Sequence, residues 1–88
     1  MEVSWFVYML ECADGTLYTG VTTDLKRRVE EHNTSPKGAK YTRARRPVVL
    51  RYSEPFQTRS EACVREAQLK KCDRAGKVLL VGNDILAV

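Results

Sequence analysis

The chain has 88 residues, of which 43% are hydrophobic and 30% charged, a composition typical of globular proteins rather than disordered, collagenous or membrane ones. No apolar run approaches the roughly 20 residues that a membrane helix needs. Glu2, with no cationic segment before a short apolar stretch, argues against a secretory signal. We therefore expect one cytoplasmic domain over residues 1–88, with no membrane partner. Cys12, Cys63 and Cys72 are too scattered for a disulfide framework or a zinc pair, so we expect free thiols.

The N-terminal part of the chain predicts a β-hairpin. Residues 4–22 hold two apolar stretches rich in β-formers, on either side of Asp14-Gly15. A two-residue loop would place Tyr8 and Tyr18 on opposite faces. A three-residue loop with Gly15 in the left-handed conformation would pair Tyr8 with Gly20 and bring both tyrosines to one face. We expect this second register, in which Gly20 leaves open space beside both rings and two hydroxyls converge on a cavity.

The rest of the chain predicts helices and one or two further strands. The first helix is capped by Asp24 and ends near Asn33, and a loop over 34–46 with a short helical turn follows it. A strand is expected over 47–53. The second helix opens with the capping box Thr58 to Glu61 and ends near Ala75 with Gly76 as its C-cap, and a short edge strand over 78–81 comes last. The predicted fold is α+β, with the order β-β-α-β-α-(β). A small, mainly antiparallel sheet of three or four strands is covered by helices.

Three helical side chains are candidates for chemistry. Arg28 and His32 stand four residues apart and so share one helix face, while one of Arg27 and Arg28 should point to water. Glu66 has apolar neighbours at helical spacing, so it lies on or beside the buried stripe of the second long helix. A carboxylate in that position needs a cation, which is either a basic side chain or a metal ion.

Positive charge is concentrated in one stretch. No acidic residue occurs between Glu31 and Glu54, although the chain as a whole carries a net charge of only +4. A solvated basic loop is one interpretation, and a surface that contacts phosphates is the other. The second interpretation assigns nucleic-acid binding to Lys37, Lys40, Tyr41, Thr42, Arg43, Arg45 and Arg46.

Taken singly, each of these residues has an ordinary structural explanation, such as a strand aromatic or an ion pair. Their order, however, resembles that of the GIY-YIG nuclease superfamily, and especially its small stand-alone bacterial subgroup. Phe6-Val7-Tyr8 stands where the family has Gly-Ile-Tyr, and Tyr18-Thr19-Gly20 stands where it has Tyr-Ile-Gly. The stretch over 38–47 resembles the signature of the subgroup, so the resemblance spans residues 5–81.

The resemblance also implies roles for five residues. Arg28 matches the catalytic arginine of the family, His32 the His or Tyr one helical turn later, and Glu66 the metal-binding glutamate. The implied activity is hydrolysis of a nucleic-acid backbone, DNA more than RNA, in repair or processing, with one Mg²⁺ or Mn²⁺ held by Glu66. Tyr8 would position or deprotonate the attacking water, the latter requiring a pKa below about 10. Arg28 would stabilise the transition state, and Tyr18 and His32 would orient water and phosphate.

Two departures keep other functions open. Val21 follows the glycine where family members often carry a lysine, and Asn83 matches the late asparagine of many members only loosely. These departures favour a nucleic-acid-binding module with little or no cleavage. An adaptor within a larger nuclease assembly is a third possibility for so short a chain.

Overall fold

The structure is a computed structural model that describes residues 4–72 and residue 76. Its elements in chain order are β1 (Trp5–Glu11), β2 (Leu17–Thr22), α1 (Leu25–Thr34), α2 (Lys40–Arg43), β3 (Val49–Phe56) and α3 (Arg59–Lys71). The predicted α+β class and element order are confirmed over these residues. The predicted strand over 78–81 lies outside them.

The three strands form one antiparallel sheet in the order β2-β1-β3. In the hairpin, Tyr8 lies opposite Gly20 and Leu10 opposite Tyr18, which is the predicted register. Gly15 has a φ of 83°, in the left-handed region that favours glycine. The three-residue loop is therefore confirmed, and with it the placement of both tyrosines on one face.

The third strand lies further along the chain than the predicted 47–53. It begins at Val49 and continues to Phe56, which pairs with Trp5. Pro55 lies within it, opposite Phe6, although proline cannot donate to a sheet ladder. Since β3 is an edge strand of the described sheet, the missing N–H is tolerated there.

The second long helix begins as predicted but ends earlier. Thr58 caps α3 by accepting a hydrogen bond from the backbone N–H of Glu61 at 3.2 Å. The helix ends at Lys71, and Cys72 rather than Gly76 is its C-cap. Leu69 is the last buried residue of α3, and the two residues that follow it within the helix, Lys70 and Lys71, are exposed.

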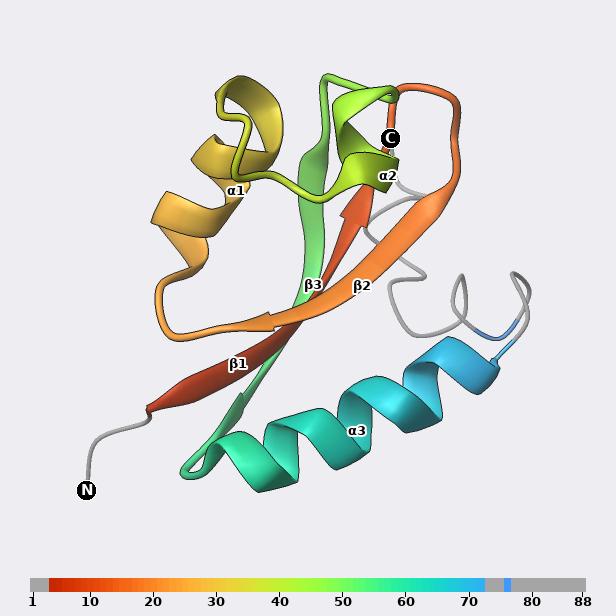
Figure 1. Ribbon diagram of the computed structural model, residues 1–88. Coiled ribbons are helices and arrows are strands. Elements are labelled where there is room, and N and C mark those ends of the chain that lie inside the picture. Colours follow the sequence, from red (N-terminus) through yellow and green to blue (C-terminus); the bar gives the residue numbers. More distant parts are fainter. Residues whose placement is uncertain (1–3, 73–75, 77–88) are drawn as a thin grey trace.

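Helices cover both faces of the sheet (Figure 1). On one face α3 packs through Ala62 and Leu69 against Val7 and Met9 of β1. On the other face the core holds Tyr8, Leu10, Cys12 and Val48, with Tyr18, Leu25 and Val29 packed against it. Side chains alternate along β1, so neighbouring residues of one strand build two separate cores.

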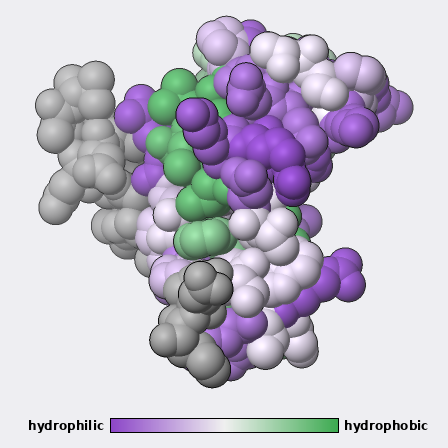
Figure 2. Space-filling view, turned by 90° about the vertical axis from the view of Figure 1, so that its left-hand side faces the viewer, coloured by the Kyte–Doolittle hydropathy of each residue, from purple (hydrophilic) through white to green (hydrophobic). Residues whose placement is uncertain are grey.

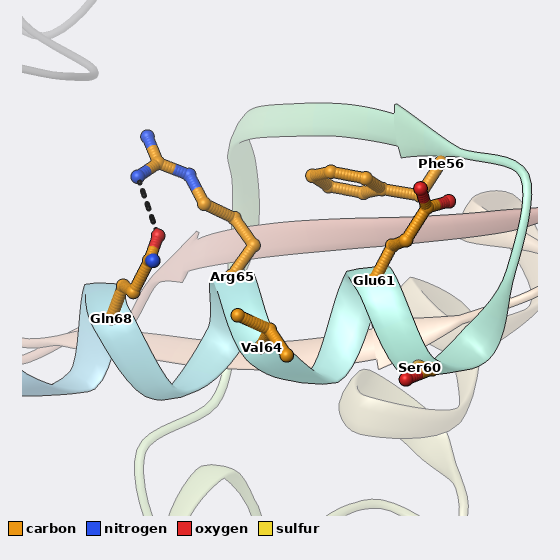
Figure 3. A pocket seen from close by; sticks show the side chains of 6 residues that line it. All are labelled: Phe56, Ser60, Glu61, Val64, Arg65 and Gln68. Carbon is orange, nitrogen blue, oxygen red and sulfur yellow. Dashed lines mark hydrogen bonds between the residues drawn. The ribbon is translucent and has the colours of Figure 1, made fainter.

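Surface hollows also lie outside the tyrosine cluster. Figure 2 shows the side of the molecule on which α1 lies, where a hydrophobic band runs beside strongly hydrophilic surface. A groove of about 710 Å³ is lined there by Leu25 and Val29 of α1 and Leu50 of β3, among others. Figure 3 shows a smaller hollow of about 310 Å³ between Phe56 and α3, where Arg65 reaches over to Gln68. Among the described residues, no helix is long and apolar enough to cross a membrane.

Candidate functional site

An aromatic cluster forms where β1, β2 and α1 meet. The ring centroids of Tyr8 and Tyr18 are 6.4 Å apart, and those of Tyr18 and His32 are 5.2 Å apart. A Cβ added at Gly20 would lie 2.5 Å from the Tyr8 hydroxyl oxygen. The expected open space beside Gly20 is therefore absent, because the Tyr8 ring itself fills it. Because Gly20 has no side chain, the Tyr8 ring can lie directly against β2 at this position.

His32 is held inside the cluster by both of its ring nitrogens. Nε2 lies 2.8 Å from the Tyr8 hydroxyl, and Nδ1 lies 2.7 Å from the Thr42 hydroxyl. The whole residue is buried. Burial, reinforced by the Arg28 charge, lowers the pKa of His32 from 6.5 to about 4. His32 is thus neutral near pH 7, and in this conformation it cannot touch a phosphate directly.

Tyr8 is equally buried, and this corrects one expectation. Desolvation by burial raises the pKa of Tyr8 from 10.0 to about 12, although the neighbouring Arg28 guanidinium opposes the rise. A base that removes a proton from water would need a pKa below its ordinary value. In this conformation Tyr8 is therefore a neutral phenol and is better suited to hold a water molecule than to deprotonate one.

Arg28 lies at the outer side of the cluster. Its guanidinium donates to the Glu31 carboxylate at 2.9 Å and to the Lys37 carbonyl at 3.0 Å, and it also interacts with the Tyr8 hydroxyl. The side chain of Arg27 is 59% exposed and that of Arg28 only 24%, so Arg27 is the one that points to water. The sequence interpretation missed Glu31, although its spacing of three from Arg28 is a usual one for helical ion pairs.

Glu66 comes from the helix on the opposite side of the sheet. The helix α3 that carries it packs on the face of the sheet opposite to the one that carries Tyr8. Its negative charge nevertheless helps to raise the pKa of Tyr8, although less than burial does. The Glu66 carboxylate is 22% exposed and pairs with Lys70, which is 54% exposed, at 3.2 Å. Its cation is thus an exposed lysine, not a buried arginine.

The basic stretch divides into free and engaged side chains. Lys37, Lys40 and Arg43 are exposed and face solvent, whereas Tyr41 is 37% exposed and its ring contacts other side chains. Thr42 is fully buried, which removes it from direct contact with a phosphate. The remaining two residues of the predicted surface are partly exposed arginines.

Both of these arginines are held by the protein itself. Arg46 donates to the carbonyls of His32 and Ser35, each at 2.6 Å, and so closes the C-terminal end of α1. Arg45 pairs with Asp14 at 3.0 Å and covers the ring of Tyr41, with 3.9 Å between its guanidinium carbon and the ring centroid. The available phosphate donors are therefore fewer than the sequence indicated.

Tyr41 extends the aromatic cluster to the surface. Its ring stacks on that of Tyr18, with centroids 6.0 Å apart and an interplanar angle of 26°. Since α2 and β2 are far apart in the chain, no local spacing could have predicted this contact. It joins the basic stretch to the tyrosine cluster, so one continuous region runs from Tyr8 to the exposed cations.

The comparisons with known proteins agree on one family. The GIY-YIG catalytic domain family matches residues 4–78. The UPF0213 protein DP2720 of Desulfotalea psychrophila is 56% identical over 78 residues, which cover 89% of this chain and 71% of that protein. The UPF0213 protein SAG0778 of Streptococcus agalactiae is 54% identical over 81 residues, covering 92% and 91%. These names state no activity.

Solved structures are similar as well. The solution structure of the UPF0213 protein BH0048 from Bacillus halodurans matches with a TM-score of 0.56 and 47% identity, over 88% of this chain and 81% of that one. The solution structure of the protein EF2693 from E. faecalis matches with a TM-score of 0.59 and 43% identity, over 98% and 90%.

Proposed function

Because the chain belongs to the GIY-YIG family, we propose that it is a divalent-metal-dependent endonuclease that hydrolyses phosphodiester bonds, with DNA as the favoured substrate. One observation carries the proposal. Tyr8, Tyr18, Arg28 and Glu66 come from four different elements, yet the ring of Tyr18 lies 6.4 Å from that of Tyr8, and the charges of Arg28 and Glu66 act in opposite directions on the pKa of the Tyr8 hydroxyl. Such convergence of titratable groups is typical of catalytic sites.

The donor set around Glu66 fits a hard cation such as Mg²⁺ or Mn²⁺. Among the described residues there is no group of three or more metal-ligating side chains, so a protein cage is not available. A single partly exposed carboxylate suffices for Mg²⁺, which keeps several waters and shares substrate oxygens. Lys70 already balances the Glu66 charge and is exposed enough to move away. A bound ion would supply stabilisation of negative charge on the scissile phosphate and the leaving oxygen.

The protein's own side chains would act in two layers, an outer one that contacts the phosphate and a buried one that holds the attacking water. In the outer layer, Arg28 neutralises charge that develops on the phosphate and Tyr18 orients it. In the buried layer behind them, Tyr8 offers its oxygen to the attacking water and His32 fixes that oxygen. A phosphate that draws Arg28 away from Glu31 would uncover Tyr8, since the guanidinium interacts with both.

The exposed part of the basic stretch would hold the flanking backbone. We assign this to Lys37, Lys40, Tyr41 and Arg43, with Arg45 contributing while it remains paired to Asp14. Contacts of this kind carry affinity and salt dependence but no base information.

A second candidate function is a binding module that does not cut. Two observations favour it, namely the burial of Tyr8 with its raised pKa, and Val21 at the position of the family's frequent lysine. Incubation of the purified protein with plasmid, branched DNA and RNA, each with Mg²⁺, Mn²⁺ or chelator, separates the two. Metal-dependent cleavage supports the nuclease, whereas binding without cleavage in every condition supports the module.

Glu66→Gln tests the metal site, and Glu54→Gln is its matched control. Glu54 also carries a partly exposed, ion-paired carboxylate, bonded to Arg65 at 2.8 Å, but lies on β3. We expect Glu66→Gln to abolish cleavage while changing the free energy of unfolding by less than about 1 kcal/mol, because exposed lysine pairs contribute little. Mg²⁺ should raise the melting temperature of the wild type and of Glu54→Gln, but hardly that of Glu66→Gln. Cleavage by folded Glu66→Gln at the wild-type rate would reject the assignment.

A further inference from the structure

Thr42 is a buried polar residue for which the proposed chemistry has no role yet. It lies in the short helix α2, is fully buried, and cannot reach a substrate. Its hydroxyl oxygen lies 2.7 Å from His32 Nδ1 and 2.9 Å from the Ala39 carbonyl oxygen. It therefore stands directly behind the histidine that contacts Tyr8.

The single hydroxyl proton of Thr42 limits how these groups can bond. If this proton goes to the Ala39 carbonyl, the Thr42 oxygen must accept from His32, so Nδ1 carries the histidine proton. Nε2 is then bare and accepts from the Tyr8 hydroxyl. These three contacts, between 2.7 and 2.9 Å, become good hydrogen bonds that run in one direction from Tyr8 to Ala39. The cost is the longest contact of the group, since the Ala39 N–H, 3.4 Å from Nδ1, loses the ring as its acceptor.

The opposite tautomer is less well satisfied. Nδ1 would accept from Thr42 and from the Ala39 N–H, the latter at a long 3.4 Å, and the Thr42 bond to the Ala39 carbonyl would be lost. Nε2 would donate to Tyr8, whose own proton would then need another acceptor, and the neighbouring polar side chain is the guanidinium of Arg28. A guanidinium has only donors, so it cannot receive that proton. Buried polar groups rarely leave such a mismatch.

We infer that Thr42 is a positioning residue, which fixes His32 in the Nδ1–H tautomer so that Nε2 accepts the proton of Tyr8. The lone pairs of the Tyr8 oxygen are then directed away from His32, toward Arg28 and the approaching water. A water molecule that donates a hydrogen bond to the Tyr8 oxygen keeps its own oxygen free to face the phosphorus atom. The catalytic consequence of this inference rests on the proposed function, whereas the direction of the hydrogen bond from Tyr8 to His32 does not depend on it.

The test combines a tautomer measurement with kinetics in three variants. Thr42→Val keeps the shape but removes the hydroxyl, Thr42→Ser restores a hydroxyl, and Thr34→Val is the control. Thr34 also donates to a carbonyl, that of Glu30 at 2.8 Å, but it is exposed on α1 and away from the His32 ring. Long-range ¹H–¹⁵N NMR of the imidazole reports which ring nitrogen carries the proton, and His32 is the one histidine of the chain.

In the wild type, Thr42→Ser and Thr34→Val we expect the Nδ1–H tautomer at pH 7. Thr42→Val should show the Nε2–H form or a mixture. Its kcat should fall by about tenfold or more with KM unchanged, because only the positioning of the water is lost. Thr42→Ser should recover most of that rate.

Two results would overturn the inference: an Nε2–H tautomer in the wild type, or a folded Thr42→Val that keeps the Nδ1–H form and the full kcat. If Thr42→Val does not fold, the wild-type spectrum and Thr42→Ser still decide. A protein that shows the predicted tautomer but never cuts would instead reject the proposed function and leave the bond direction standing.

Discussion

Acidification should destabilise this protein through His32, at pH values above those at which most carboxylates take up a proton. The imidazole is buried among Tyr8, Tyr18 and Thr42, with Arg28 and Arg46 as nearby positive charges and Glu31 as the opposing negative one. Burial is the largest cause that lowers its pKa from 6.5 to about 4. Protonating it in the folded state would bury a charge and break its bond from Tyr8.

The sign and size follow from linkage between folding and protonation. Between about pH 6.5 and 4 the unfolded chain binds the histidine proton and the folded chain does not, so the stabilisation is complete above pH 6.5 and is lost as the pH falls. In full it amounts to about 3 kcal/mol, of which about 2 kcal/mol should be lost between pH 7 and pH 4.5. Asp14 and Glu31 have pKa values lowered from 3.8 and 4.5, so the stabilisation from these two carboxylates starts to be lost only at the acidic end of this interval.

Urea unfolding followed by circular dichroism, at pH values from 4.5 to 7, measures this loss. His32→Gln is the matched variant, since glutamine keeps hydrogen-bonding groups but does not titrate. We expect its free energy of unfolding to be nearly independent of pH over this interval, whatever its absolute stability. The chain has one histidine, so an NMR titration assigns the pKa directly. A pKa near 6.5 in the folded protein, or equal pH slopes for both proteins, would refute the reasoning.

Three further predictions concern single substitutions. Gly20→Ala would place a Cβ 2.5 Å from the Tyr8 hydroxyl oxygen, so it should displace that ring, cost about 1–3 kcal/mol and remove cleavage, which unfolding curves and a cleavage assay measure together. Arg46→Ala should lower the free energy of unfolding by about 2 kcal/mol, because the carbonyls at the end of α1 lose the guanidinium that donates to them. Arg43 is exposed, so Arg43→Ala should leave stability unchanged but reduce the salt dependence of nucleic-acid binding by about one unit of slope. Equal effects of the two on stability would contradict this division. Thr19→Val should stabilise the fold by about 1 kcal/mol in thermal unfolding, because the Thr19 hydroxyl is buried and has no hydrogen-bond partner among the described residues; a clear loss of stability would indicate a bonded hydroxyl.

Local features of the sequence were sufficient for the hairpin and the starts of the helices. The Asp14-Gly15 turn defined the register that brings Tyr8 and Tyr18 together, since glycine alone accommodates a left-handed residue there without strain. Asp24 and Thr58 marked the two helix starts, because a side-chain cap satisfies backbone groups only a few residues away. These are short-range effects, so they can be read from neighbouring residues. The family resemblance, carried by the same spacing, was confirmed by the comparisons.

The tertiary structure alone decided what each candidate side chain can do. Burial, which depends on elements far apart in the chain, turned Thr42 from a phosphate donor into a partner of His32 and raised the pKa of Tyr8 instead of lowering it. Packing placed Glu66 on the layer opposite the tyrosines and used Arg46 to close α1. Composition and spacing state which charges and donors a chain carries. Which of them face water is set by long-range contacts, because desolvation and pairing depend on the neighbours that folding brings together.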